Sequence, residues 1–196
     1  LRGIAAVGVM FFHAERSFVL HLPGGYLAVD LFFGLSGFVI AYAYQERLRE
    51  GFATREFLIR RAIRLWPMVL LGAVLAMVLH GGHAGMLFLL PNWKSDGLLY
   101  PSNPPMWSLL FEAIAYCAFA LVLHRLGNAA LMAIMGASAL TLTALALSPG
   151  HFTDFGADWA SFGGGLARVG YAFTAGVLVF RWHDVSASRT SPLAWL

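Results

Sequence analysis

Six long apolar segments constrain this chain more than any other feature of its sequence. They cover Gly3–Leu22, Tyr26–Tyr44, Leu65–His80, Met106–Leu123, Ala129–Ser148 and Leu166–Phe180. A helix needs roughly 20 apolar residues to cross the hydrocarbon core of a bilayer, and each segment has roughly 15–20 residues. A membrane β-barrel would instead need shorter segments of alternating polarity. We therefore predict an all-α fold, a polytopic transmembrane helical bundle with about six spans.

The positions of the cations predict how these spans are oriented. Lys and Arg number 13 against 10 Asp and Glu, and most arginines follow the second, fourth and sixth spans. Loops rich in Lys and Arg stay on the cytoplasmic side of a membrane, so we expect these connections and the start of the first span in the cytoplasm. The residues concerned are Arg47, Arg49, Arg55, Arg60, Arg61, Arg64, Arg125, Arg181 and Arg189.

Residues 1–196 are interpreted as a single membrane domain. The chain starts at Leu1 without an initiator methionine, and we expect the domain to be truncated at both ends. The connection over residues 45–66 carries its own helix signal, with Thr54 as the predicted N-cap. We predict a basic amphipathic helix there that lies at the inner surface and runs into the third span near Pro67. Only 12% of the residues are charged and no polar nucleic-acid-binding domain is present, so the lipid bilayer is an expected partner and nucleic acid is not.

Ionisable residues inside the predicted spans indicate a functional site, because a charge is costly in hydrocarbon. They are His13 in the first span, Asp30 in the second, Glu112 in the fourth and Arg168 at the outer start of the sixth. By helix rise, Asp30 lies roughly 6–8 Å inward from the outer end of its span, and Glu112 and His13 about 9–10 Å inward. We predict that His13, Asp30 and Glu112 meet in one cavity, where a carboxylate would make the imidazole a better base. The alternative is a set of interhelical hydrogen bonds that hold the bundle together.

A second group of candidate residues lies at the inner surface. Arg60 and Arg64 share a helix face and Arg61 flanks it, an arrangement that suits a polyanion such as a nucleotide pyrophosphate. Anchoring to anionic lipid is the alternative. Arg2 lies eleven residues before His13, so the two side chains share a helix face roughly 16 Å apart.

Two further motifs carry less weight. His80 and His83 have a spacing found in metal sites, but two glycines separate them and no acidic ligand is near, so we predict no metal. Ser108 has the hydroxyl of a nucleophile without the Gly-x-Ser-x-Gly turn that would activate it. We expect its hydroxyl to bond the helix backbone.

Five blocks of this sequence, in order, resemble those of the acyltransferase-3 family of bacterial membrane O-acyltransferases. They are Leu1–Ala6 leading to His13, Gly25–Phe33 with Leu35–Phe38, Phe57–Pro67, Met106–Leu109 with Glu112, and Arg168 with Phe173 and Gly176. One departure is Ala28 before Val29-Asp30, where the family more often has glycine. Family members usually have about ten spans, each of the roughly 20 residues that cross a bilayer, so helices are expected beyond these six.

The resemblance implies an enzyme of the bacterial inner membrane that takes an acyl group, often acetyl, from acyl-coenzyme A. The acceptor would be a hydroxyl of a carbohydrate or glycolipid of the cell envelope, and no cofactor would be bound permanently. The donor phosphates would bind Arg60, Arg61 and Arg64, with Arg2. His13 would act as general base or accept the acyl group itself, with Asp30 or Glu112 orienting it; Trp107, Ser108 and Arg168 are further site residues of the same blocks.

Two other functions are compatible with the residues alone. Buried His, Asp and Glu also form the proton relays of coupled transporters, although no internal symmetry of the transporter kind is visible. A membrane scaffold would use the same polar residues to join helices.

Overall fold

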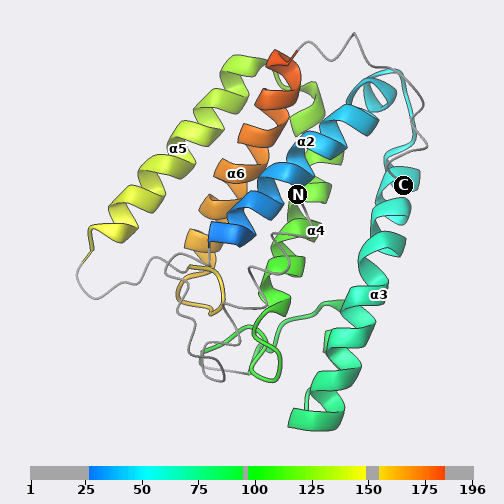
Figure 1. Ribbon diagram of the computed structural model, residues 1–196, viewed down its shortest axis with the longest axis vertical. Helices are drawn as coiled ribbons and strands as arrows, with labels where there is room; N and C mark the ends of the chain where they lie inside the picture. Colours follow the sequence, from blue (N-terminus) through cyan, green and yellow to red (C-terminus); the bar gives the residue numbers. More distant parts are fainter. Residues whose placement is uncertain (1–26, 95–96, 149–154, 184–196) are drawn as a thin grey trace.

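The computed structural model describes residues 27–94, 97–148 and 155–183, and this part of the chain is a helical bundle (Figure 1). Its α-helices are α2 (Leu27–Arg49), α3 (Thr54–His80), α4 (Met106–Leu121), α5 (Asn128–Ala146) and α6 (Phe162–Trp182), with 3-10 turns at Ala84–Phe88 and Leu123–Arg125. Helices α2, α3, α5 and α6 are long and apolar enough to cross a membrane, and α4 is a shorter apolar helix. The predicted all-α membrane bundle is confirmed; the predicted first span lies outside the described residues.

The helix directions agree with the predicted topology. In Figure 1, α2, α4 and α6 run toward one end of the bundle and α3 and α5 run away from it. The arginines at the end of α2 and the start of α3 and Arg125 between α4 and α5 therefore lie at the same end, which we call the inner end. Many aliphatic side chains of α3 and α5, Val78 and Leu140 among them, are exposed, as suits helices that face lipid tails.

The helix predicted to run into the third span near Pro67 is present, as the first part of one helix that continues through that span. Residues 54–80 form one continuous 27-residue helix that includes Pro67. A proline removes one backbone donor, and transmembrane helices tolerate that loss where neighbouring groups compensate. The prediction of Thr54 as the N-cap was wrong: Ala53 occupies the N-cap position, and no side chain caps the helix. At about 1.5 Å per residue, α3 is about 40 Å long, enough to span the hydrocarbon core and extend beyond it.

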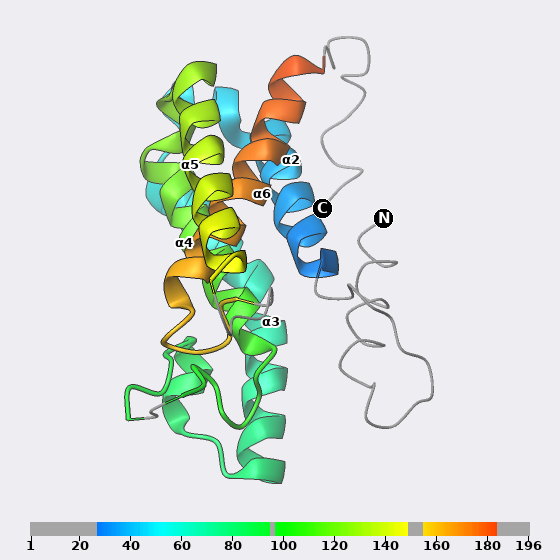
Figure 2. The same ribbon diagram turned by 90° about the vertical axis from the view of Figure 1, so that its left-hand side faces the viewer.

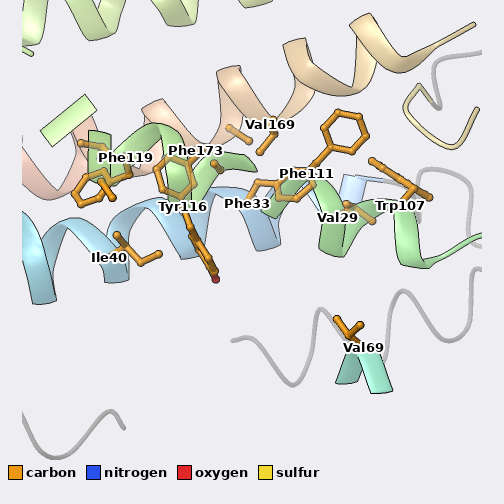
Figure 3. Packing of buried hydrophobic residues seen from close by; sticks show 14 of the residues in the cluster. Val29, Phe33, Ile40, Val69, Trp107, Phe111, Tyr116, Phe119, Val169 and Phe173 are labelled. Atoms are coloured by element: carbon orange, nitrogen blue, oxygen red, sulfur yellow. The ribbon is translucent and has the colours of Figure 1, made fainter. Parts of the chain in front are cut away.

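Glycines allow α2 and α6 to pack with their backbones in contact. A Cβ atom built on Gly37 would lie 2.1 Å from the carbonyl oxygen of Phe173, and one on Gly176 would lie 2.0 Å from the carbonyl oxygen of Gly34. Small residues commonly permit such close approach in membrane bundles. The largest fully buried side chains are mostly aromatic, and Figure 3 shows Phe33, Phe111, Phe119 and Phe173 among the buried side chains.

At the inner end, polar side chains tie the helix termini together. Arg181 on α6 donates to the side chain of Gln45 on α2 (2.7 Å) and to the carbonyl oxygen of Leu126 (2.7 Å). His124 is 1% exposed, and its Nε2 accepts from Arg125 while its Nδ1 lies 2.8 Å from the carbonyl oxygen of Phe119. Since Nε2 accepts, Nδ1 carries the proton and donates. These bonds satisfy the carbonyl group of Phe119 in the last turn of α4 and that of Leu126 after the following 3-10 turn.

The opposite, outer end is closed by two loops that pair through their backbones. The amide of Leu99 donates to the carbonyl oxygen of Ala157 (2.9 Å), and Leu98 and Asp158 form an isolated β-bridge. The Tyr100 side chain is fully buried beneath this pairing and donates to the carbonyl oxygen of Leu89 (2.6 Å). The loop after α3 and the loop before α6 therefore form one packed unit.

Burial raises the pKa of the Tyr100 hydroxyl, and this makes the stability of the outer loops dependent on alkaline pH. The neutral hydroxyl stabilises the fold fully below the unfolded pKa of about 10, and that contribution is lost as the pH rises above it. We expect Tyr100→Phe to lower the free energy of unfolding by ~1 kcal/mol at neutral pH and to weaken its fall above pH about 10. Thermal unfolding in detergent between neutral pH and pH about 11 measures both effects. Tyr171→Phe, at an exposed tyrosine, is the control and should change neither.

Candidate functional site

At the outer end, an ion pair joins α2 to α6. The Nε and Nη2 atoms of Arg168 donate to the Oδ1 and Oδ2 atoms of Asp30 at 3.0 and 3.2 Å. The Arg168 guanidinium also donates from Nη1 to the carbonyl oxygen of Phe155 (2.9 Å) and lies 5.1 Å from the centre of the Trp107 ring. Three residues that the sequence pointed to separately, Asp30, Trp107 and Arg168, are thus brought together.

The environment of this pair is unusual for charged groups. The Arg168 side chain is 3% exposed and that of Asp30 is 26% exposed. A bidentate arginine–carboxylate pair is the geometry in which two charges offset the most desolvation. Sequence analysis had grouped Asp30 with His13 and Glu112, whereas the structure gives its carboxylate Arg168 as a partner. The pair holds the outer ends of α2 and α6 at a fixed distance and presents a charged group beside Trp107.

Nearer the middle of the bundle, Glu112 on α4 accepts hydrogen bonds from two hydroxyl groups. The Ser36 hydroxyl on α2 donates to its Oε1 atom at 2.7 Å, and the Tyr116 hydroxyl donates to the same oxygen. The two hydroxyl oxygens are 3.1 Å apart. Ser36 is completely buried and Tyr116 nearly so, while Glu112 is half-buried. The carboxylate is therefore held in one orientation at a depth of about 9 Å along α4, where it can accept or share a proton.

Sequence reasoning did not identify Ser36 or Tyr116. Glu112 and Tyr116 are four residues apart and so share a helix face, which was a readable signal. Ser36 offered no such signal, because a single serine in an apolar span more often bonds its own helix backbone. Its role becomes visible only when α2 is placed against α4.

At the inner end, the three arginines differ in their surroundings. Arg61 is 6% exposed, donates from Nη2 to the Tyr44 hydroxyl (3.1 Å) and lies 4.9 Å from the centre of that ring. Its Nε atom is buried and has no hydrogen-bond partner among the described residues. Arg60 is exposed and pairs with Glu56 at 2.6 Å, and Arg64 is exposed as well. Arg61 thus faces the bundle while Arg60 and Arg64 face outward.

Aromatic rings accompany these cations, a feature not predicted from the sequence. The guanidinium groups of Arg47 and Arg60 lie 4.6 and 5.6 Å from the centre of the Phe52 ring. Guanidinium groups over aromatic faces are attracted by the ring quadrupole while their donors stay available for an anion. The inner end is therefore suited to bind a phosphate-bearing molecule.

The remaining candidates are placed as follows. The Ser108 hydroxyl donates to the carbonyl oxygen of Pro105 (2.9 Å), a bond to the backbone of the same helix end. Within residues 27–94, 97–148 and 155–183, no three His, Cys, Asp or Glu side chains gather as a metal site. His13 and Arg2 lie outside the described residues, so their roles stay predictions.

Comparison with known proteins agrees with the family resemblance seen in the sequence. The whole chain, residues 1–196, matches the protein family described as "Acyltransferase domain" (Acyl_transf_3). Over 76 residues it is 46% identical to "Protein 2 in picA locus" of Rhizobium radiobacter, which covers 38% of this chain and 40% of that protein. Over 124 residues it is 29% identical to the peptidoglycan O-acetyltransferase OatA of Listeria monocytogenes, covering 59% of this chain and 18% of that protein. The chain thus spans less than half of either relative. No solved structure matches it significantly.

Proposed function

This chain belongs to the acyltransferase-3 family, and from that premise we propose that it is part of a multi-pass membrane O-acetyltransferase. The donor is acetyl-coenzyme A or another acyl-coenzyme A on the cytoplasmic side, and the acceptor is a hydroxyl of a carbohydrate or glycolipid of the cell envelope. The membrane is the inner, cytoplasmic membrane of a bacterium. The name of the Listeria relative, a peptidoglycan O-acetyltransferase, supports a glycan acceptor.

The observation that carries the donor assignment is the environment of Arg61. A buried guanidinium with an unpartnered Nε atom is costly, and an anionic ligand offsets that cost. Arg60 and Arg64 lie on the same helix within one turn and supply further positive charge at the surface. We assign these three arginines, with Arg2, to the phosphates of coenzyme A.

The chemistry takes place between the donor site and the outer face. His13 removes the proton from the acceptor hydroxyl, whose oxygen attacks the thioester carbonyl carbon. The carbon–sulfur bond breaks, an ester forms, and the coenzyme A thiolate takes up the proton that the imidazolium gives back. Glu112, held by Ser36 and Tyr116, stabilises the imidazolium in the way an orienting carboxylate supports a catalytic histidine. The extended pantetheine arm, roughly 15–20 Å, would match the roughly 16 Å between Arg2 and His13 that the predicted first span would give if it is helical.

Transfer of labelled acetyl groups tests this proposal. Membranes that contain the full-length parent protein are incubated with labelled acetyl-coenzyme A, and the label in the cell-envelope glycans is counted. We expect label with the wild type and none with His13→Ala at equal protein level. Equal label in both would remove His13 from the mechanism, and no label in either would contradict acetyl transfer itself.

The donor site has its own prediction, Arg61→Lys. Lysine keeps the charge but loses the planar set of donors that binds phosphate in two places, so we expect the KM for acetyl-coenzyme A to rise about tenfold, equivalent to ~1.4 kcal/mol. The KM for the acceptor should not change. Arg55→Lys, at an exposed arginine nine residues before Arg64 and two before Phe57, is the control. A defect confined to acceptor use would contradict the assignment of Arg61 to the donor.

A further inference from the structure

Two tryptophans from different loops form an aromatic surface at the outer end. Trp93 follows α3, Trp159 precedes α6, and their ring centres are 4.8 Å apart with planes inclined at 33°. Trp93 is 73% exposed, one of the most exposed large side chains among the described residues. We refer to Trp93 and Trp159 as the outer aromatic platform. Figure 2 shows the loops that carry them, below α4 and α6 and away from the inner end.

Backbone bonds hold the platform in place. The indole Nε1 of Trp159 donates to the carbonyl oxygen of Asn92, the residue before Trp93, at 3.1 Å. The Trp159 amide donates to the carbonyl oxygen of Gly97 (3.1 Å), next to the bridge between Leu98 and Asp158. The Trp159 ring is thus fixed before any ligand arrives and offers Trp93 a ring to pack against, which lowers the entropic cost of binding.

Further rings connect the platform to the candidate site. Trp159 stacks on Phe162 at 5.9 Å, and Phe162 contacts Phe111 at 5.0 Å. Phe111 is fully buried on α4 and directly precedes Glu112. A molecule seated on the platform would therefore lie at the outer end of the helix that carries Glu112.

We propose that the outer aromatic platform binds pyranose rings of the acceptor glycan. The C–H groups on one face of a pyranose carry partial positive charge and pack on the negative face of an aromatic ring. Exposed Lys94 and half-buried Asp158 flank the two tryptophans in sequence and would supply charged partners for sugar hydroxyls, although one Asp158 oxygen already accepts from the Ser161 amide at 2.7 Å. The inference rests on the proposed function, because it names where that reaction would receive its acceptor.

Lipid is the other ligand that an exposed tryptophan suggests, and the observations favour sugar. Interfacial tryptophans place their N–H among lipid headgroups, but the Trp159 N–H already donates within the protein. Trp93 also lies thirteen residues beyond the end of α3, in a loop paired with another loop rather than on a membrane helix. The exposed side chains that suit lipid tails are the aliphatic ones of α3 and α5.

Binding of defined oligosaccharides tests the platform without acyl transfer. The full-length parent protein in lipid nanodiscs is titrated with chitotetraose, cellotetraose or maltotetraose, three linear pyranose oligomers, and tryptophan fluorescence is recorded. We expect saturable binding of at least one oligomer, weakened about tenfold by Trp93→Ala, as for loss of an aromatic anchor. Trp93→Phe, which keeps an aromatic face, should restore most of the affinity. Trp182→Ala, which removes a 59% exposed tryptophan at the inner end, is the matched control.

The titration either supports or overturns sugar binding by the outer aromatic platform. Loss of binding in Trp93→Ala at an unchanged melting temperature, with Trp182→Ala unaffected, supports the platform. No fluorescence change with any of the three oligomers, or equal binding by wild type and Trp93→Ala, overturns it. Strong quenching of Trp93 by brominated lipid without a response to sugar would assign the residue to the membrane interface instead. Since no acyl donor is present, a failure of the proposed acetyl transfer would appear in the transfer assay and not in this titration.

Discussion

Gly176→Ala is expected to prevent α2 and α6 from packing correctly, although it adds a single methyl group. The new Cβ atom would lie 2.0 Å from the carbonyl oxygen of Gly34 and 2.8 Å from the amide nitrogen of Phe38. Both are backbone atoms, so a side-chain rotation cannot relieve the clash and one helix must move. Overpacking a tight core typically costs 1–3 kcal/mol, and we expect ~3 kcal/mol or more here because the backbone has to shift.

Gly136→Ala on α5 is the matched control for this prediction. A Cβ atom at Gly136 has no atom within 4 Å, and alanine favours helix over glycine by about 1 kcal/mol. Size-exclusion profiles and melting temperatures in mild detergent should show loss of the monodisperse, folded species for Gly176→Ala and an unchanged or higher melting temperature for Gly136→Ala. Equal behaviour of the two variants would mean that the backbones of α2 and α6 do not touch at Gly176.

Arg168→Met is expected to destabilise the outer end of the bundle strongly. Methionine replaces the apolar stem of the side chain but not the guanidinium, so it leaves the Asp30 carboxylate without its bidentate arginine and the Phe155 carbonyl without its guanidinium donor. Breaking a buried ion pair by removing one partner typically costs 3–5 kcal/mol. Asp30 keeps some contact with solvent at 26% exposure, so we expect a loss near the lower end, ~3 kcal/mol, in the free energy of unfolding.

A second substitution separates the effect of charge from that of packing. In the Asp30→Asn, Arg168→Met double variant the negative charge that lost its arginine is gone, and part of the lost stability should return. Arg60→Met breaks the exposed pair with Glu56 and should leave the melting temperature almost unchanged, because surface ion pairs contribute little. Two results would contradict the structural role assigned to the Asp30–Arg168 pair. One is a loss of stability in Arg168→Met as small as that in Arg60→Met, and the other is no recovery of stability in the double variant.

The candidate site illustrates which kinds of residue a sequence can reveal. Asp30, Glu112 and Arg168 stood out because each is charged within an apolar segment, and the structure gives each of them polar partners. Ser36 and Tyr116 did not stand out, since neutral hydroxyls carry little penalty in a span. Arg60, Arg61 and Arg64 were recognised as a group, but which of the three is buried depends on where α2 lies.

Errors of prediction arose where local signals competed with tertiary contacts. Thr54 suggested the N-cap of the third helix, yet the structure has Ala53 at that position, and the helix continues through Pro67. Capping preferences are worth about 1 kcal/mol, and the removal of one helical bond is offset where neighbouring groups compensate within a bundle. Local free-energy contributions of this size decide the structure only where tertiary packing does not favour one of the alternatives.

Hydrophobicity and charge are properties of the chain itself, and they were enough to predict helices that cross a membrane, their alternating direction, and the basic inner end. The contact partners of individual side chains could not be predicted in this way, because they depend on which helices become neighbours. The pairing of Asp30 with Arg168, the Ser36 hydroxyl on Glu112 and the ring contact of Trp93 with Trp159 join residues far apart in sequence. Those contacts follow from the close crossing of α2 and α6 and the pairing of the outer loops. A six-segment hydropathy pattern is compatible with many helix arrangements, and only the packed structure selects one of them.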